Sequence, residues 1–253
     1  MSRRVLVTRA QDQADPLVHA LAAAGLEPIA VPTIEVRLEP PGGPLDAAVR
    51  DLAAFGWVAV TSPNGAAAVL AANHRVGAVL GQTRWAAVGS ATAAVLERVG
   101  VAVDFLPDES TGRALADGLP IEPGDRVLLP RGDLAGEAVP AGLLARGAVV
   151  VDVVAYRTHE APATSRGSLR AAFAPNPPDA VILTSGSTAR GLLRLADDIG
   201  LDVRGIAAVC AGPETAREVR RLGFGVAAVS RSPDPAALAD ATATAVAEPV
   251  ASR

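Results

Sequence analysis

Small polar residues stand where short apolar runs of this sequence give way to helix-like segments. Thr61-Ser62 and Thr184-Ser185 mark two of these points. Backbone N–H groups and the helix dipole at a helix start favour anions, and hydroxyl groups beside them add further donors. We therefore predict that these positions bind an anionic small molecule. The predicted binding residues are Thr8, Arg9, Thr61, Ser62, Asn64, Ser90, Arg131, Ser185, Thr188, Gly212 and Thr215.

The same residue types have a plainer explanation, because Ser, Thr and Asn are the usual N-caps of helices. The recurrence of Thr-Ser does not decide between a cap and a site, since a duplicated ancestor would copy either one. Arg9 and Arg131 are predicted to clamp carboxylates, with surface ion pairing or capping as the alternative. Tyr156, the only tyrosine, is either a proton donor or a hinge residue that packs its ring.

The chain contains two copies of one α/β unit, arranged out of order. Residues 57–117 align without a gap on residues 180–240, at a constant offset of 123. The segment VLVTRAQ (5–11) aligns on VLLPRGD (127–133) at an offset of 122. The first copy is therefore split around the second, which predicts two similar lobes joined by two chain crossings.

The order of the copies predicts the domain boundaries. Residues 1–35 and 160–253 should form one discontinuous lobe, and residues 36–159 the inserted lobe. Ile34 and Tyr156 match at the offset of 122, so the two crossings are quasi-equivalent and should form a two-stranded linker. A cleft between two lobes is a common place for a small molecule. We predict the active site in such a cleft, with Tyr156 at its mouth.

Strand-like and helix-like segments alternate along both copies. The strand-like runs lack clean polar alternation, which is typical of parallel strands buried on both faces. Five βα units in each lobe predict a doubly wound parallel sheet of the flavodoxin-like kind. The predicted strands lie near 4–8, 27–31, 180–184, 206–210 and 226–229 in one lobe, and near 126–130, 149–155, 57–61, 85–88 and 103–106 in the other.

Composition excludes several classes of protein. Half of the residues are apolar but only 3% are aromatic, so the core must be built from Val, Leu, Ile and Ala. No apolar run reaches the ~18 residues of a membrane span, and the N-terminus shows no secretory signal, so a cytoplasmic protein is expected. A net charge of −4 without any basic stripe argues against nucleic acid as a partner.

Common catalytic and cofactor motifs are absent from the sequence. His19, His74 and His159 have no metal-ligand spacing with Cys210, the only cysteine, so no metal is expected. Cys210 lies in a buried-strand pattern, which favours inert packing. There is no dinucleotide-binding glycine motif, no P-loop and no hydrolase nucleophile elbow.

Short motifs follow one another along the whole chain. They are VLVTRAQ (5–11), WVAVTSPNG (57–65), WAAVGSATAAVLERVG (85–100), ESTGRALA (109–116), VLLPRGD (127–133), ARGAVVVDVVAYRT (145–158), AVILTSGST (180–188) and GPETA (212–216). In their order and spacing these motifs resemble the uroporphyrinogen-III synthase family.

The resemblance implies an enzyme of tetrapyrrole biosynthesis, a lyase that closes linear hydroxymethylbilane into uroporphyrinogen III with loss of water and inversion of ring D. It implies no cofactor, and it matches Tyr156 to the tyrosine usually assigned as proton donor. A phenol is protonated at neutral pH and can donate to the leaving hydroxyl. The substrate carries eight carboxylates, which suits backbone amides and hydroxyls as binders. A monomer is expected, with possible hand-over from the upstream bilane-forming enzyme.

Two other functions remain open on the residues alone. A non-catalytic bilobed sensor or binding protein for an anionic metabolite would use the same cleft and loops, without needing Tyr156. A hydrolase or transferase on the same fold would need a nucleophile and base pair that the sequence does not show.

Overall fold

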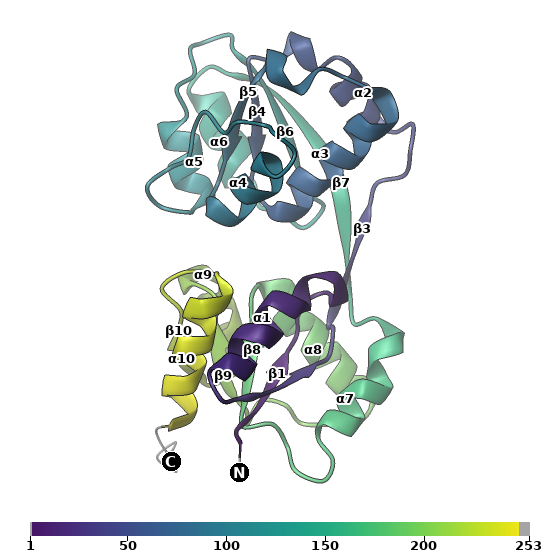
Figure 1. Cartoon of the computed structure of the whole chain (residues 1–253), viewed down its shortest axis with the longest axis vertical. Coiled ribbons are helices and arrows are strands. Elements are labelled where there is room, and N and C mark those ends of the chain that lie inside the picture. Colours follow the sequence, from purple (N-terminus) through teal and green to yellow (C-terminus); the bar gives the residue numbers. More distant parts are fainter. Residues whose placement is uncertain (1, 248–253) are drawn as a thin grey trace. The chain divides into compact units, whose positions relative to one another are not determined.

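The structure is a computed structural model that describes residues 2–247, except for the side chain of Asp12. The chain divides into two compact units (Figure 1). The first lobe comprises the residues up to Glu35 together with those from His159 onward, and the second lobe comprises Val36–Thr158. The second lobe is thus inserted into the first.

The first lobe contains a five-stranded sheet in the order β10-β9-β8-β1-β2, with every pairing parallel. Numbered along this lobe, the strands run 2-1-3-4-5, which is the flavodoxin-like doubly wound order. Its elements are β1 (Arg4–Val7), α1 (Gln11–Ala23), β2 (Glu27–Ala30), a short 3-10 turn (Ala163–Ser165), α7 (Arg166–Ala172), β8 (Ala180–Leu183), α8 (Gly186–Asp198), β9 (Ala207–Cys210), α9 (Pro213–Arg221), β10 (Val226–Val229) and α10 (Pro235–Ala247).

The second lobe contains a sheet in the order β3-β7-β6-β4-β5. Its pairs among β7, β6, β4 and β5 are parallel and repeat the order β2-β1-β8-β9 of the first lobe. Its elements are β3 (Ile34–Leu38), α2 (Pro44–Arg50), a 3-10 turn (Leu52–Ala54), β4 (Trp57–Val60), α3 (Pro63–Val76), a second turn (Leu80–Gln82), β5 (Arg84–Ala87), α4 (Ser90–Glu97), α5 (Gly112–Gly118), β6 (Arg126–Gly132), α6 (Ala138–Ala145) and β7 (Val149–Glu160).

Strand register follows the sequence repeat residue by residue. In the first lobe Val5 lies opposite Ala180, and the repeat-related pair Val127 and Trp57 lies opposite in the second. The other pairings obey the same two offsets of 122 and 123. The prediction of two similar doubly wound lobes is therefore confirmed at the level of individual residue pairs.

One predicted strand is wrong. Residues 103–106 form only an isolated bridge, between Phe105 and Ala86. The Asp104 carboxylate accepts a hydrogen bond from the Trp85 N–H at 2.8 Å. A side chain therefore occupies the donor that a longer ladder would use, and the pairing stops after one bridge.

Both chain crossings lie in β3 and β7, which are neighbours in one sheet. The boundary between the lobes falls inside each of these strands, after Glu35 in β3 and after Thr158 in β7. Figure 1 shows β3 and β7 running side by side. β7 has twelve residues, far more than the four of its counterpart β2, because it also carries the return crossing.

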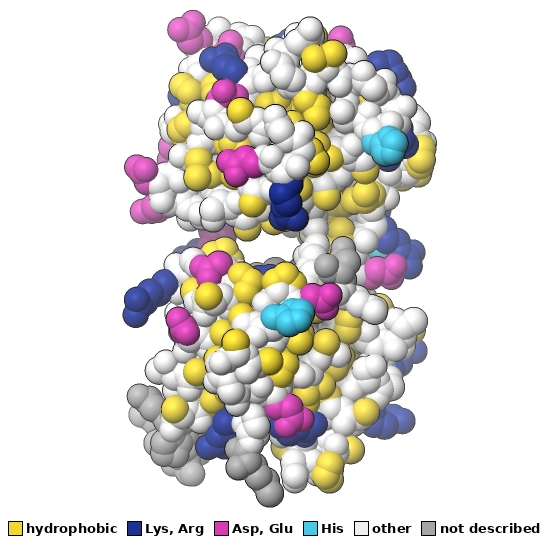
Figure 2. Space-filling model, viewed as in Figure 1, with side chains coloured by type: hydrophobic (Ala, Val, Ile, Leu, Met, Phe, Trp, Pro, Cys, Tyr) yellow, Lys and Arg dark blue, Asp and Glu magenta, His cyan; other side chains and the backbone are white. Residues whose placement is uncertain are grey.

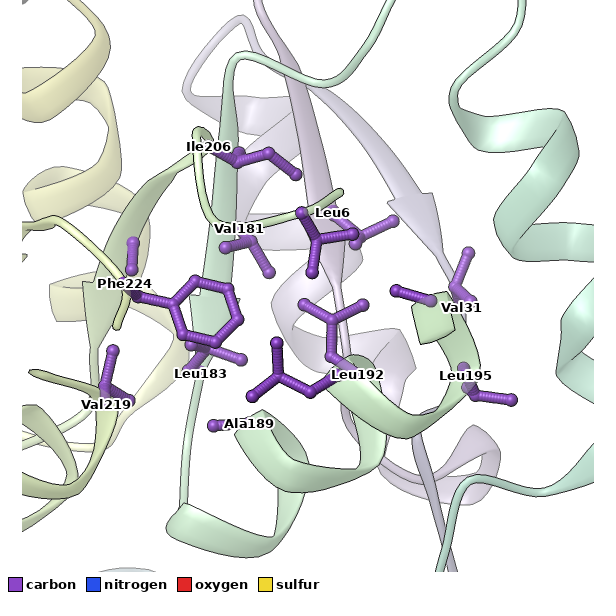
Figure 3. Close-up of a cluster of buried hydrophobic side chains, with 14 of the residues drawn as sticks. Leu6, Val31, Val181, Leu183, Ala189, Leu192, Leu195, Ile206, Val219 and Phe224 are labelled. Carbon is purple, nitrogen blue, oxygen red and sulfur yellow. The ribbon is translucent and has the colours of Figure 1, made fainter. Parts of the chain in front are cut away.

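Helices cover both faces of each sheet because successive residues of a strand point to opposite faces. In β1, Leu6 packs with α7, α8 and α9, while Val5 and Val7 pack with α1 and α10. Figure 3 shows Leu6 and Val181 of neighbouring strands beside Leu192 of α8 and the ring of Phe224. The second lobe is built the same way, with α2, α3 and α4 on one face of the sheet and α5 and α6 on the other.

A close backbone contact fixes the start of the first crossing. Thr33 is fully buried, and its hydroxyl donates to the carbonyl of Thr188 at 2.9 Å. A Cβ on Gly191 of α8 would lie only 2.1 Å from the Thr33 carbonyl oxygen. Glycine at this position therefore lets α8 pack directly against the backbone that leads into β3.

Candidate functional site

Ser62 lies where a doubly wound sheet changes the direction of its winding. In the second lobe this switch point falls between the carboxyl ends of β4 and β6, and ligands of such folds bind outside it. Ser62 follows β4 and is the N-cap of α3, with its Oγ accepting from the Gly65 N–H at 3.0 Å. The cap explanation is therefore correct for Ser62, but it accounts for only one of its contacts.

The second contact of Ser62 is with Tyr156. The Ser62 Oγ and the Tyr156 hydroxyl lie 3.0 Å apart, and either can be the donor. Tyr156 stands on β7 and is half-buried, with its ring packed against the core on the α3 side of the sheet. The ring thus has a packing role, while the hydroxyl is held by a side chain that the helix start fixes in place.

The backbone around Tyr156 is held by the loop that follows β6. Its carbonyl accepts from the Asp133 N–H at 3.1 Å, and the Asp133 carboxylate accepts from the Thr158 N–H at 2.9 Å. The pairing of β6 with β7 continues to Gly132 opposite Tyr156, with a register shift just before it. This irregular end of the ladder brings the tyrosine to the end of β6, beside Ser62.

Arg131 does not have the predicted free donors. Its side chain is nearly buried, and all five N–H groups are already engaged within the second lobe. Its Nε and Nη2 donate to Asp152, its Nη2 also donates to Glu137, and its Nη1 donates to the carbonyls of Ala135 and Gly136. In this structure no Arg131 donor remains for a substrate, so the predicted carboxylate clamp stays a prediction without structural support at this residue.

The role of Arg131 is instead to hold the loop beside Tyr156. Hydrogen bonds to Asp152 raise the pKa of its guanidinium, burial lowers it, and hydrogen bonds to Glu137 raise it further, so the net pKa lies above the ordinary value. The guanidinium therefore stays charged. It ties the segment that begins at Gly132 to β7, the strand that carries Tyr156.

Ser185 occupies the matching switch point of the first lobe, and its neighbours differ from those of Ser62. It caps α8, forms a capping box with Thr188, and its Oγ lies 2.8 Å from the Oγ of Ser187. The position related to Tyr156 by the repeat is Ile34, which has no hydroxyl. The serine and phenol pair is therefore a feature of the second lobe and was not simply copied with the fold.

Thr8 and Thr188 are fully buried, and their role in substrate binding stays a prediction that this burial does not favour. The hydroxyl of Thr8 donates to the Ile182 carbonyl at 2.7 Å, which joins β1 to β8. The hydroxyl of Thr188 donates to the Ser185 carbonyl at 2.8 Å, and it accepts from the Ser185 N–H at 3.2 Å, which completes the capping box. Both hydroxyls stabilise the first lobe rather than facing a ligand.

Arg9 differs from its repeat-related partner Arg131. It is half-buried after β1, and its Nη2 donates to the Pro233 carbonyl at 3.0 Å. Among the side chains that the structure describes, no carboxylate forms an ion pair with Arg9. Burial lowers the pKa of its guanidinium below the ordinary value. A cation in this environment gains from an incoming carboxylate, so Arg9 remains a predicted anion-binding residue.

The other predicted binding residues lie near the carboxyl ends of the strands. Thr61 and Asn64 flank the Ser62 cap and are half-exposed, and Ser90 is exposed at the start of α4. Gly212 is the N-cap of α9 and has open space where a side chain would stand. Thr215 donates to the Thr184 carbonyl at 3.4 Å. These residues stay predictions for substrate binding.

Sequence reasoning missed the partners that position the phenol. Asp152 interrupts the apolar run VVVDVV of β7, and a charge inside such a run is a signal for a buried partner. Glu137 and Asp133 lie in a loop that shows no pattern of its own. Gly132 was visible as a glycine at a strand end, but only the structure shows the ring that lies against it.

Neither a patch of one charge on the face shown in Figure 2 nor a metal-binding cluster marks a second site in the described residues. Acidic and basic side chains are interspersed on the face shown in Figure 2. Within residues 2–247, no three His, Cys, Asp or Glu side chains come together in a way that could hold a metal ion. No helix in the same part of the chain is long and apolar enough to cross a membrane.

Comparisons with known proteins agree on one family. A family model described as uroporphyrinogen-III synthase HemD matches residues 15–240. A protein named uroporphyrinogen-III synthase from Synechococcus elongatus is 33% identical over 242 residues, which cover 88% of this chain and 87% of that protein. The porphyrin biosynthesis protein HemD of Ruminiclostridium josui is 30% identical over 86% of this chain, which spans only 44% of that longer protein.

Similarity extends to solved structures. A mutant uroporphyrinogen III synthase from the extremely thermophilic bacterium Thermus thermophilus superposes with a TM-score of 0.65 at 18% identity, with 97% of this chain and 99% of that chain covered. At this level of identity the match supports the fold alone.

Proposed function

We propose that this chain, which belongs to the uroporphyrinogen-III synthase family, catalyses the closure of hydroxymethylbilane to uroporphyrinogen III. The observation that carries the proposal is the contact of Tyr156 with Ser62 at the switch point of the second lobe. The contact supports the proposal because it joins the one phenol of the chain to a capped helix start at the edge of the sheet outside which doubly wound folds bind ligands.

Proton transfer to the leaving group is the step that Tyr156 is proposed to assist. The phenol donates its proton to the terminal hydroxyl of the bilane, the carbon–oxygen bond breaks, and water leaves. The substituted carbon of ring D attacks the resulting electrophilic carbon, and the spiro intermediate fragments and recloses with the ring inverted. The proton released on rearomatisation returns to the phenolate, so the enzyme is regenerated and one water is lost in total.

Ser62 supports this step because its Oγ is already fixed by the Gly65 N–H. A hydroxyl can accept from the neutral phenol and, after rotation, donate to the phenolate oxygen. Donors that are held in place before the reaction stabilise developing charge without reorganising. Ser62 is therefore proposed to hold the phenol oriented before proton transfer and to stabilise its anion afterwards.

Carboxylate binding is proposed to fall to the helix starts of both lobes and to Arg9. The helix dipoles of α3, α8 and α9 favour an anion at their N-terminal ends, where cap serines already accept from the N–H groups of Gly65 in α3 and Thr188 in α8. Exchange of Arg9 for glutamine should weaken binding several-fold with little effect on turnover. Because these contacts are ionic, binding should also weaken as salt is added.

A direct test of the function is incubation with hydroxymethylbilane followed by oxidation and separation of isomers I and III. Isomer III in excess over the spontaneous isomer I supports the proposal. Tight binding of the bilane without isomer III would identify the alternative, a non-catalytic binding protein. A monomer, a cytoplasmic location and hand-over from the upstream bilane-forming enzyme belong to the same proposal and need their own measurements.

A further inference from the structure

We propose that Gly132 is a positioning residue for Tyr156: because Gly132 has no side chain, the phenol ring can lie against the end of β6 and its hydroxyl can reach Ser62. The consequence for turnover rests on the proposed function, whereas the position of the ring does not. A Cβ on Gly132 would lie 2.7 Å from two ring carbons and 2.9 Å from the phenol oxygen. At such distances the ring must move if any side chain is added.

The direction of that movement follows from what is fixed around the ring. The backbone of Tyr156 is held by the Asp133 N–H, and the loop after β6 is held by three hydrogen bonds from Arg131, whose other two bind Asp152 of β7. The ring is half-buried and ends at the phenol oxygen, so its outer end is the part that can yield. A Gly132→Ala chain should therefore fold, with the hydroxyl displaced from Ser62.

The repeat shows that this arrangement is particular to the second lobe. The positions related to Gly132 and Tyr156 are Ala10 and Ile34 in the first lobe. The second lobe thus has the larger residue at one position, Tyr156 in place of Ile34, and the smaller residue at the other, Gly132 in place of Ala10. The position related to Gly65 is Thr188, and a Cβ on Gly65 would lie 2.9 Å from the Pro130 carbonyl oxygen. Glycine at position 65 therefore lets the start of α3 lie against the backbone of β6, next to Ser62.

The kinetic test compares Gly132→Ala with Gly136→Ala. Gly136 lies in the same loop, and a Cβ there would meet no atom within 4 Å, so its exchange is the matched control. Gly132→Ala should lower kcat by about 10²-fold, the loss expected when a positioned acid is removed, with little change in KM. Gly136→Ala should leave both values near wild type.

A double-mutant cycle separates displacement of the hydroxyl from other effects of the added methyl group. In a Tyr156→Phe background there is no hydroxyl to displace, so Gly132→Ala should lower turnover no further. An equal loss in both backgrounds would overturn the proposal. If Tyr156→Phe alone is fully active, the acid role fails, while the position of the ring remains open to a measurement that does not use activity.

That measurement is NMR of protein containing tyrosine labelled with 13C in its ring. Since the chain has one tyrosine, every labelled ring signal reports on Tyr156. The signals should shift in Gly132→Ala and stay unchanged in Gly136→Ala; unchanged signals in both variants would contradict the proposal. If Gly132→Ala does not fold, Gly132→Ala combined with Tyr156→Ala should fold as well as Tyr156→Ala alone. A further failure of that pair would show that the ring is not what the methyl group meets.

Discussion

Replacement of Tyr156 by phenylalanine separates the chemistry of the phenol from the packing of its ring. The substitution removes one neutral hydrogen bond of 3.0 Å, to the Ser62 Oγ. Ser62 keeps the Gly65 N–H as a donor and is half-exposed, so no buried polar atom is orphaned. The free energy of unfolding should therefore fall by about 0.5–1.5 kcal/mol at most.

The effect on catalysis should be larger. If the phenol donates its proton in the transition state, turnover should fall by about 10²-fold or more, which corresponds to at least about 2.7 kcal/mol of lost transition-state stabilisation. Spontaneous closure to isomer I should then take a larger share of the product. The assay combines initial rates with bilane, separation of the oxidised isomers, and urea unfolding of the same preparations.

Two serine variants provide the matched control. Ser62→Ala and Ser185→Ala each remove an N-cap and should each cost about 1 kcal/mol of stability. Only Ser62→Ala also removes the partner of the phenol, so only that variant should lower kcat strongly. The acid role of Tyr156 is excluded if Tyr156→Phe turns over like wild type while Tyr156→Ala unfolds, because the tyrosine would then be structural.

Further predictions concern stability and reactivity. Burial raises the pKa of the Cys210 thiol to about 11, so a thiol reagent should modify it only after urea unfolds the chain, as absorbance at several urea concentrations would show; rapid native labelling would contradict this. Hydrogen bonding by Arg75 lowers the pKa of the Asp46 carboxyl. The pair therefore stabilises the fold at pH values above the ordinary Asp pKa, and this stabilisation is lost as the pH falls through the lowered pKa. Asp46→Asn should thus cost stability at pH 7 and lose that cost in acid, and equal losses at both pH values would refute the assignment. Gly191→Ala forces a methyl group onto a backbone carbonyl and should lower the free energy of urea unfolding by about 1–3 kcal/mol or more. Gly167→Ala, with open space around the added methyl group, should change that free energy by less than about 1 kcal/mol. Similar values for both variants would show that α8 has room to move.

Much of the fold could be predicted because both copies of the repeat carry the same signals. Gly100 and Gly223 are aligned by the repeat, and both adopt the left-handed backbone that ends a helix. The two offsets predict that the pairings of one copy recur in the other, and the structure shows this recurrence for four shared strands. The strand predicted at residues 103–106 is wrong because the Asp104 carboxylate takes the Trp85 N–H that a longer strand ladder would use. Competition of this kind by a side chain leaves the apolar sequence pattern unchanged.

The site was less predictable because residue type does not show which donors are already used. Arg9 and Arg131 are aligned by the repeat, yet Arg131 is fully paired through Asp152, a residue 21 positions further along the chain. Thr8 and Ser62 both follow a strand, but one hydroxyl is buried against a neighbouring strand while the other meets a phenol. Such differences depend on three-dimensional neighbours and need a structure.

Catalysis of the inverting closure can be measured by isomer analysis with the bilane in large excess over enzyme. Under these conditions a binding protein can protect or redirect at most one substrate molecule for each protein molecule. Isomer III should accumulate over many turnovers as the main product, and its share should drop sharply in Tyr156→Phe. Isomer I as the main product with the wild-type chain, at every enzyme concentration, would contradict this expectation.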